Sequence, residues 1–266
     1  TMTVPASADL NVVQPDDIAH WWPVSGRTSH KYTRGVVTLD TGSTRYPGAA
    51  LLGIAGALYA GAGMVRYVGP ASPQLVLGQF PSVVLEPGRV QATVVGSGWG
   101  EPDAARLARF AEPGNAVVAD AEALRCLPDA GLGEWLLTPH AGELAELLGV
   151  AREDVEREPV ESAREAARRT GATVLLKGGE QYVAESSGRV SVACPGPGWT
   201  ATAGAGDVLA GICGALLAAG LEPWRAGVMG ASIQALTAAQ HPGPYPPNHL
   251  ATLLPTTIAR LVQPRA

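Results

Sequence analysis

The chain has 266 residues and a net charge of −5, with 46% hydrophobic and 16% charged residues. This composition can bury a large core and is not typical of a disordered chain. The acidic balance offers no basic surface for a nucleic acid. The apolar runs are too short and too glycine-rich to span a bilayer, and the first residues show no secretory signal. Three widely spaced cysteines fit a reducing compartment, so we expect a cytoplasmic protein without a nucleic acid or membrane partner.

Short β-branched runs alternate with helix-like segments along most of the chain. We assign residues 1–29 to an N-terminal extension with a first helix, and residues 30–266 to a single domain. Buried parallel strands are predicted at 35–40, 64–68, 92–96, 116–120, 135–138 and 173–177. Helices are predicted at 47–62, 101–112, 141–149 and 153–170, a β-hairpin at 179–196, and three apolar helices at about 205–219, 224–240 and 248–263. This order predicts a doubly wound, mostly parallel α/β sheet flanked by helices.

Four glycine-containing turns follow predicted strands. They are "DTGS" (40–43), "GSGWG" (96–100), "TPHAGE" (138–143) and "KGGEQ" (177–181). Ligands of doubly wound sheets bind beyond the carboxyl ends of the strands. We therefore expect the ligand site at the edge where these four turns meet.

The stretch "TAGAGD" (202–207) precedes an apolar helix and carries a single acid, Asp207. Gly204 and Gly206 would let backbone N–H groups converge at the helix N-terminus, where the dipole favours an anion. Asp207 could then take a proton from an attacking hydroxyl in phosphoryl transfer. The competing interpretation is that Asp207 only caps the helix.

Lysine is rare in the chain. Lys31 and Lys177 are the two lysines among 19 basic residues, and Lys177 ends a predicted strand just before two glycines. A lysine suits phosphate as a compact point charge, although a lysine at a strand end is often only a surface residue. In "TPHAGE", Thr138 or His140 with Glu143 is typical of helix capping, and Asp120 at the end of a strand is read as an N-cap.

Three common nucleotide or hydrolase motifs are missing. The first βα unit has no Gly-x-Gly-x-x-Gly fingerprint with a following acid, and the chain has no Gly-x-x-x-x-Gly-Lys-Ser/Thr loop. It also lacks a Gly-x-Ser-x-Gly nucleophile elbow. A Rossmann dehydrogenase, a P-loop enzyme and an elbow-type serine hydrolase are therefore disfavoured.

Each motif is weak alone, but their order resembles one family. "TGSTRYPGAALLG", "GSGWG", "VADAEAL", "TPHAGELAELLG", "VLLKGGEQYV" and "TAGAGDVLAG" follow one another as in the ADP/ATP-dependent NAD(P)H-hydrate dehydratases. The resemblance runs from about residue 30 to about residue 220. It implies a ribokinase-like fold for residues 30–266. It also implies that ADP or ATP, with Mg²⁺, phosphorylates the ring hydroxyl of hydrated NADH or NADPH, and that phosphate then leaves. ADP is the donor typical of bacterial members.

The resemblance assigns roles to particular residues. Asp207 is similar to the catalytic base of the family, and it also contacts the substrate. The other implied contacts to the hydrated dinucleotide are Ala49, Gly98 and His140. The implied nucleotide contacts are Lys177, Gly178, Gly179, Glu180, Gln181 and Gly206, and the expected anion hole is Gly204, Ala205 and Gly206. The resemblance names no metal ligands. A separate NAD(P)H-hydrate epimerase as functional partner and a homo-oligomeric assembly are further expectations.

Two other functions stay open at this point. A small-molecule kinase of the same fold, acting on a vitamin precursor, would use the same base and anion hole. The family often has threonine where Ala205 stands, and "HPGPYPP" (241–247) replaces the usual His-Gly neighbourhood. These departures motivate a third possibility, a nucleotide-binding protein that has lost catalysis.

Overall fold

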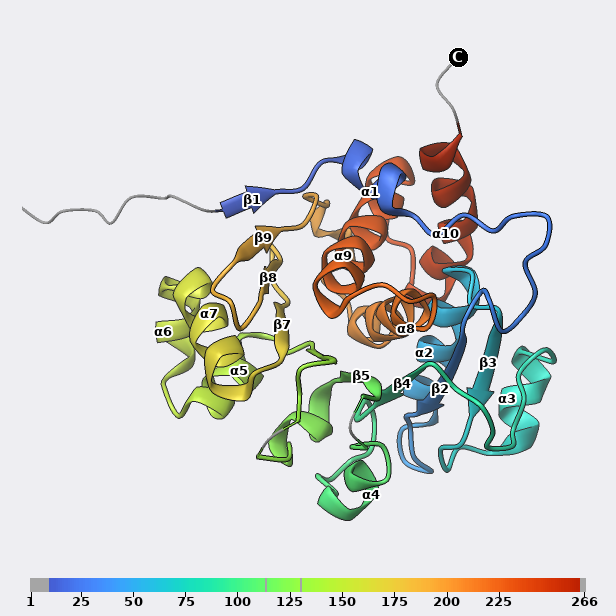
Figure 1. Cartoon of the computed structure of the whole chain (residues 1–266), viewed down its shortest axis with the longest axis horizontal. Coiled ribbons are helices and arrows are strands. Elements are labelled where there is room, and N and C mark those ends of the chain that lie inside the picture. The colour runs from blue at the N-terminus through green and yellow to red at the C-terminus, as the bar shows by residue number, and fades with distance from the viewer. Residues whose placement is uncertain (1–9, 113, 130, 264–266) are drawn as a thin grey trace, which may run out of the picture.

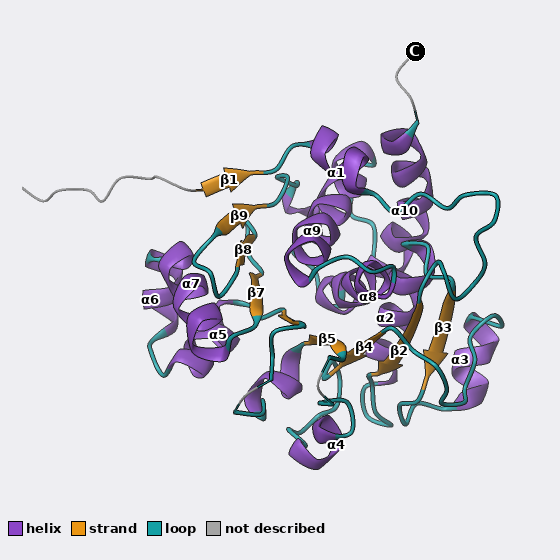
Figure 2. Cartoon of the chain, viewed as in Figure 1, coloured by secondary structure: helices purple, strands orange, loops and turns teal. Residues whose placement is uncertain are grey.

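The computed structural model describes residues 10–112, 114–129 and 131–263. Its strands form one nine-stranded sheet with the order β1-β9-β8-β7-β6-β5-β4-β2-β3 (Figures 1 and 2). The β7–β8 and β8–β9 pairs are antiparallel, and the other pairs are parallel. The strands are β1 (Leu10–Val12), β2 (Val36–Asp40), β3 (Met64–Tyr67), β4 (Ala92–Val95), β5 (Ala116–Ala119), β6 (Trp135–Leu137), β7 (Thr173–Leu176), β8 (Tyr182–Ala184) and β9 (Val190–Val192).

Helices cover both faces of the sheet, as a doubly wound fold requires. The α-helices are α1 (Pro15–Trp21), α2 (Pro47–Tyr59), α3 (Pro73–Gln79), α4 (Ala104–Ala108), α5 (Ala141–Leu148), α6 (Arg152–Arg157), α7 (Pro159–Thr170), α8 (Ala205–Ala218), α9 (Pro223–Gln240) and α10 (Pro247–Val262). Short 3₁₀ turns lie at Ala121–Arg125 and Gly198–Thr200. The predicted α/β class with a mostly parallel sheet is confirmed.

Neighbouring residues of one strand pack into two different cores. Val94 and Leu136 belong to the core beneath α2, α8, α9 and α10, whereas Val95 and Leu137 belong to the core beneath α5 and α7. Successive side chains of a strand point to opposite faces of the sheet. Strands that are buried on both faces therefore read as continuous apolar runs.

Helix α8 lies unusually close to α2 and to the sheet because its contact positions are glycines. A Cβ on Gly56 would lie 2.1 Å from the carbonyl oxygen of Val208, and a Cβ on Gly211 would lie 2.0 Å from that of Gly53. A Cβ on Gly214 would lie 2.3 Å from Cγ2 of Val94. These glycines allow the close approach, and they fix where the N-terminus of α8 lies.

Several elements differ from the sequence prediction. Strand β1 was not predicted, and it pairs in parallel with β9 at the edge of the sheet. Helix α3 was not predicted either. The helix expected at 153–170 is two helices, since Pro159 disfavours helical backbone at Glu158. The helix expected at 101–112 is only α4, which starts after its N-cap, Asp103. Within the described ranges, no helix has the length and apolarity needed to cross a bilayer.

Candidate active site

Asp207 lies in the first turn of α8 but does not cap that helix. The N-cap is Gly204, whose φ of 92° lies in the left-handed region that favours glycine. No side chain makes a capping hydrogen bond at this position. The interpretation of Asp207 as a simple helix cap is therefore wrong, and its carboxylate is available for another role.

The surroundings of Asp207 hold its proton more tightly than water would. Burial raises the pKa of Asp207 to about 6, and the negative charge of Asp120 adds to the rise. The charge of Lys177 and the nearby hydroxyl of Ser97 work in the opposite direction. A carboxylate that titrates near 6 is largely ionised at neutral pH and still has appreciable basicity, which suits a general base.

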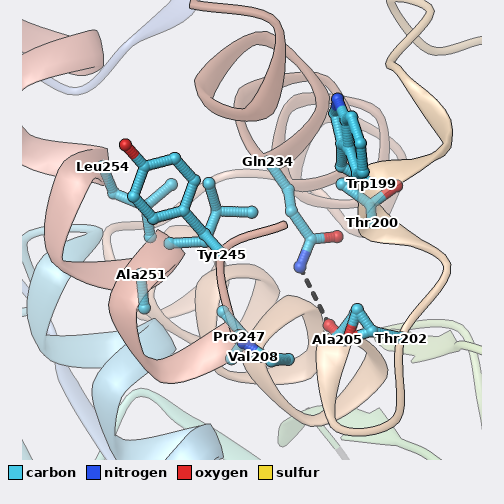
Figure 3. Close-up of a pocket in the computed structure, with 11 residues that line it drawn as sticks. Trp199, Thr200, Thr202, Ala205, Val208, Gln234, Tyr245, Pro247, Ala251 and Leu254 are labelled. Atoms are coloured by element: carbon cyan, nitrogen blue, oxygen red, sulfur yellow. Dashed lines mark hydrogen bonds between the residues drawn. The ribbon is translucent and has the colours of Figure 1, made fainter. Parts of the chain in front are cut away.

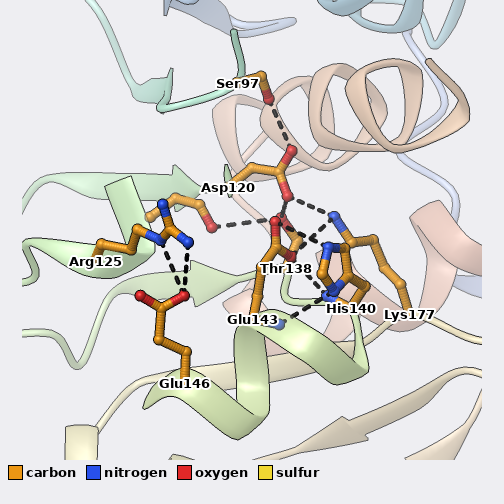
Figure 4. A network of polar contacts seen from close by, with 9 residues as sticks. Ser97, Asp120, Arg125, Thr138, His140, Glu143, Glu146 and Lys177 are labelled. Atoms are coloured by element: carbon orange, nitrogen blue, oxygen red, sulfur yellow. Dashed lines mark hydrogen bonds and ion pairs between the residues drawn. The ribbon is translucent and has the colours of Figure 1, made fainter. Parts of the chain in front are cut away.

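Asp120 is the centre of a buried polar network at the carboxyl ends of the strands (Figure 4). It accepts hydrogen bonds from Oγ of Ser97 and Oγ1 of Thr138, each at 2.8 Å, and from Nζ of Lys177 at 2.6 Å. Asp120 makes no side-chain hydrogen bond to the turn that follows it. Asp120 therefore occupies the N-cap position that was predicted, but its side chain does not cap the turn. Three polar partners from three other strand ends compete successfully for its carboxylate.

Lys177 connects this network to the N-terminus of α8. Its Nζ lies 3.9 Å from Glu143, and a Cβ on Gly206 would lie 3.4 Å from the same nitrogen. Burial works to lower the pKa of Lys177, but the charges of Asp120, Glu143 and Asp207 outweigh burial and raise that pKa. Lys177 is therefore a charged ammonium beside Gly206, and the structure brings these two predicted nucleotide contacts together.

His140 begins α5 in a capping box. Its Nδ1 accepts from the backbone N–H of Glu143 at 3.1 Å, and the carboxylate of Glu143 accepts from the backbone N–H of His140 at 2.7 Å. Of the two capping candidates, His140 is the cap and Thr138 bonds to Asp120 instead. Lys177 donates its backbone N–H to the carbonyl of Pro139 at 2.8 Å, which brings His140 beside the end of β7. The side chain of His140 is 60% exposed and remains open to a ligand.

Ala49 and Gly98 touch each other. A Cβ on Gly98 would lie 2.5 Å from the Cβ of Ala49, and the φ of Gly98 is 69°. Glycine is therefore required at position 98 by space and by backbone conformation. The structure brings together these two predicted substrate contacts, which are 49 positions apart in the sequence.

One hollow adjoins the network. An open pocket of about 880 Å³ is lined in part by His140, Lys177, Gly178, Gly179 and Glu180. Gln181 is not among its lining residues, and the backbone carbonyl of Gln181 accepts from Ala193 at 3.0 Å. Four of the five residues in the predicted "KGGEQ" nucleotide loop therefore line a hollow that a ligand could enter.

A second and much smaller hollow, of about 10 Å³, lies behind the N-terminus of α8 (Figure 3). Trp199 and Tyr245, each partly exposed, line it on different loops. Nε2 of Gln234 donates to the carbonyl of Ala205 at 2.9 Å at its base. The backbone N–H of Ala205 donates to Thr202 at 3.2 Å, so it would have to exchange partners to serve in the expected anion hole.

Comparisons with known proteins identify the family. A family model described as NAD(P)H-hydrate dehydratase matches residues 37–263. The chain belongs to the NAD(P)H-hydrate dehydratase family. It is 35% identical over 233 residues to an ADP-dependent (S)-NAD(P)H-hydrate dehydratase of Neisseria meningitidis, covering 80% of this chain and 79% of that protein. It is 43% identical over 234 residues to a bifunctional NAD(P)H-hydrate repair enzyme of Mycobacterium tuberculosis, covering 83% of this chain.

The chain spans about half the length of the first curated relatives it matches, 49% in the mycobacterial case. Among solved structures, a Bacillus subtilis ADP/ATP-dependent NAD(P)H-hydrate dehydratase co-crystallised with ATP and Mg²⁺ matches with a TM-score of 0.86 at 23% identity, covering 96% of this chain and 100% of that one. A ribokinase-like superfamily protein from Enterococcus faecalis matches with a TM-score of 0.87 at 18% identity, covering 99% and 100%. The predicted ribokinase-like fold is confirmed.

The dehydratase family implies Mg²⁺, and the side chains present do not form a ready cage for it. In the part of the chain that the structure describes, no group of three or more His, Cys, Asp or Glu side chains could hold a metal ion. The gap between Asp120 and Glu143 is occupied by the ammonium of Lys177. Two carboxylates with a lysine between them do not fit a preformed divalent site.

Asp120 is the site residue whose role the sequence did not reveal. One signal was present, since Asp120, Thr138 and Lys177 all follow predicted strands and such ends share one edge of a parallel sheet. The sequence favours a cap because an acid before a helical turn has the same local pattern whether it caps the turn or bonds to distant residues.

Proposed function

We propose that this protein restores NADH or NADPH from the hydrated dinucleotide in a reaction that consumes an adenine nucleotide, most simply ADP. The observation that carries the proposal is the position of Asp207. Its carboxylate is flanked by the ammonium of Lys177 and by Ser97, the neighbour of Gly98 in the sequence. One base thus lies close to a cation suited to phosphate and to the residue that precedes Gly98.

The proposed reaction assigns a task to each group. The ring hydroxyl of the hydrate attacks the terminal phosphorus of the nucleotide, and its proton passes to Asp207. Lys177 compensates the charge on the transferring phosphoryl group, and the N–H of Gly206 at the start of α8 can bind the same group. The carbon–oxygen bond of the new ester then breaks, phosphate leaves, and the adjacent ring carbon loses a proton to the phosphate or to water, which restores the double bond. ADP becomes AMP, and Asp207 passes its proton to water, so the protein itself is unchanged.

The surrounding hollows suit the remaining parts of the substrates. We place the nucleotide phosphates at Lys177 and Gly206 and the base against the exposed ring of Trp199, since flat rings stack well on aromatic faces. His140 is open to the hydrated dinucleotide. We propose that Mg²⁺ enters with the polyphosphate rather than in a protein cage. No step above passes through the metal ion.

Three wider proposals rest on the family rather than on a contact. We propose a cytoplasmic location, a homo-oligomeric assembly, and an NAD(P)H-hydrate epimerase as functional partner. The last agrees with the description of the mycobacterial relative as a bifunctional repair enzyme.

The test is a direct absorbance assay. Purified protein is mixed with hydrated NADH and Mg²⁺, with ADP in one cuvette and ATP in the other. Recovery of the absorbance of reduced nicotinamide only when nucleotide is present is the expected result, and the faster cuvette names the donor. A folded protein that binds ADP but gives no recovery with either nucleotide contradicts the proposal. An accumulating phosphorylated alcohol in a vitamin-precursor screen would then favour the kinase, and no product at all would favour a protein without catalysis.

A further inference from the structure

A buried ion pair lies next to the proposed hydrate site, and the reaction outlined above does not use it. Asp40 ends β2 with a side chain that is 1% exposed, and Nε of Arg106 on α4 donates to its Oδ1 at 3.0 Å. A terminal nitrogen of the same guanidinium also donates to Oδ1, so two nitrogens of Arg106 bond to this one oxygen. The second oxygen of Asp40 is buried and has no hydrogen-bond partner within the described residues.

Trp99 ties the same pair to the "GSGWG" loop. The guanidinium of Arg106 lies over the indole ring, 4.4 Å from its centroid. Nε1 of Trp99 donates to the backbone carbonyl of Asp40 at 2.7 Å. Arg106 therefore contacts both the carboxylate of Asp40 and the ring of Trp99. Trp99 is itself hydrogen-bonded to the backbone of Asp40.

These contacts join the two loops that form the hydrate side of the site. Gly42 donates its backbone N–H to the carbonyl of Ser97 at 2.7 Å, and a Cβ on Gly42 would lie 2.9 Å from that of Ala50. Ala49 and Gly98 meet just beyond. A shift of either loop by a few tenths of an ångström would change the surface that these two residues present.

We propose that Arg106 is a positioning residue, which holds residues 41–49 against residues 96–100 so that the surface for the hydrated ring is formed before substrate arrives. The inference rests on the proposed function for the identity of the substrate. A buried ion pair gives little net stability compared with apolar side chains of the same volume, but the two contacts of Arg106 with Oδ1 and its position over the ring of Trp99 favour one geometry of the pair. Preformed geometry favours binding because less ordering is needed when the ligand arrives.

The proposed nucleotide contacts, Lys177 and Gly206, lie on other elements of the fold. Lys177 follows β7 and Gly206 belongs to α8, and the hydrogen bonds and ion pairs of Arg106 in the described structure join it to neither. Loss of the ion pair should therefore affect the two substrates unequally. This inequality separates positioning from a general loss of stability.

The experiment compares Arg106→Gln with Arg109→Gln, which makes the same change at an exposed arginine just after α4. KM is measured for hydrated NADH at saturating ADP and for ADP at saturating hydrate. We expect Arg106→Gln to raise the KM for the hydrate about ten-fold or more and to leave the KM for ADP within about two-fold. Arg109→Gln should match the wild type for both. Trp99→Phe keeps a ring beneath the guanidinium and removes only the indole N–H, so it should give a smaller rise in the hydrate KM if Arg106→Gln proves too unstable.

Amide hydrogen exchange gives a readout that needs no substrate. Residues 41–50 and 96–100 should exchange faster in Arg106→Gln than in Arg109→Gln, while the strands away from these loops keep their protection. Equal exchange in the two variants, an unchanged hydrate KM in folded Arg106→Gln, or equal increases in both KM values would each overturn the inference. If the wild type shows no dehydratase activity but the exchange rates differ as expected, the proposed function fails and the positioning of the loops by Arg106 stands.

Discussion

Nζ of Lys177 donates to Oδ1 of Asp120 over 2.6 Å, which joins the ends of two strands that are 57 positions apart in the sequence. This contact holds an ammonium beside the start of α8 and places a negative charge close enough to Asp207 to raise its pKa. The phosphate-binding side and the basic side of the proposed reaction are therefore electrostatically connected, and a change to one should be measurable at the other.

The first prediction concerns Asp207→Asn. The amide cannot accept the proton of the hydroxyl, so kcat should fall by about 100-fold or more, which is the usual contribution of a positioned base. ADP should still bind, because Lys177 and the N-terminus of α8 are intact. Stopped assays give kcat and calorimetry gives the affinity for ADP. Turnover equal to that of the wild type would show that Asp207 is not the base.

The second prediction concerns the pH dependence of the reaction. The ionised form of Asp207 is the active form, and its pKa is about 6. The value of kcat/KM for the hydrate should therefore rise as the pH increases through about 6 and then level off. An ascending limb with its midpoint near pH 4 would mean that the acting carboxylate is not held in this buried environment.

The same shift in pKa makes a third prediction, about stability. Asp207 has a higher pKa in the folded chain than its ordinary value of 3.8, so the native state binds more protons between these two values and loses stability as the pH rises across them. Asp207→Asn removes this loss. The variant should be more stable than the wild type at pH 8, by about 1–3 kcal/mol, and the difference should disappear below about pH 4. Denaturant unfolding at the two pH values measures both quantities.

The sequence was sufficient for the central strands and for the turns that follow them at one edge of the sheet. Runs such as 116–120 and 173–177 are apolar because helices cover both faces of those strands, and that burial leaves a pattern in the residues themselves. Strand β1 leaves no such pattern. Its three residues are exposed, and only pairing with β9 makes them a strand. The break before α7 could have been predicted from Pro159, but the helix predicted at 153–170 runs across it.

The residues of the site divide in the same way. Some can be predicted from their neighbours in the sequence, and others depend on contacts with distant residues. The glycines before Asp207 and after Lys177 indicate tight backbone turns, so both positions could be identified from the sequence as candidate site residues. The bonding of Asp120 depends on Ser97, Thr138 and Lys177, which lie 18 to 57 positions away from it. A pattern confined to a few neighbouring residues does not contain that information.

The fourth prediction uses two variants that should move the pKa of Asp207 in opposite directions. Asp120 raises this pKa and Lys177 lowers it. Asp120→Asn should therefore lower the pKa of Asp207, and Lys177→Met should raise it. Carbon-detected NMR of labelled aspartate carboxyls follows the titration without any need for activity, and the resonance is assigned by its absence in Asp207→Asn. Shifts of the same sign in both variants would contradict the electrostatic connection.

The fifth prediction tests the glycine contact that sets the depth of α8. In Gly56→Ala the new methyl group would lie 2.1 Å from the backbone carbonyl oxygen of Val208, and backbone atoms cannot move aside as a flexible side chain can. The free energy of unfolding should fall by about 1–3 kcal/mol, as in other overpacked cores. Gly48→Ala is the matched control, because it changes the same helix where no atom lies within 4 Å of the added carbon.

Alanine is a better helix former than glycine, so Gly48→Ala should leave the stability unchanged or raise it by up to about 1 kcal/mol. The two variants make the same chemical change and should differ in the sign of their effect. Val208 follows Asp207, so relief of the clash in Gly56→Ala must also displace the base, and kcat should fall with the stability. Equal stabilities for the two variants would mean that α2 and α8 are not in the contact described. An unchanged kcat in a destabilised Gly56→Ala would mean that the position of Asp207 does not depend on this contact.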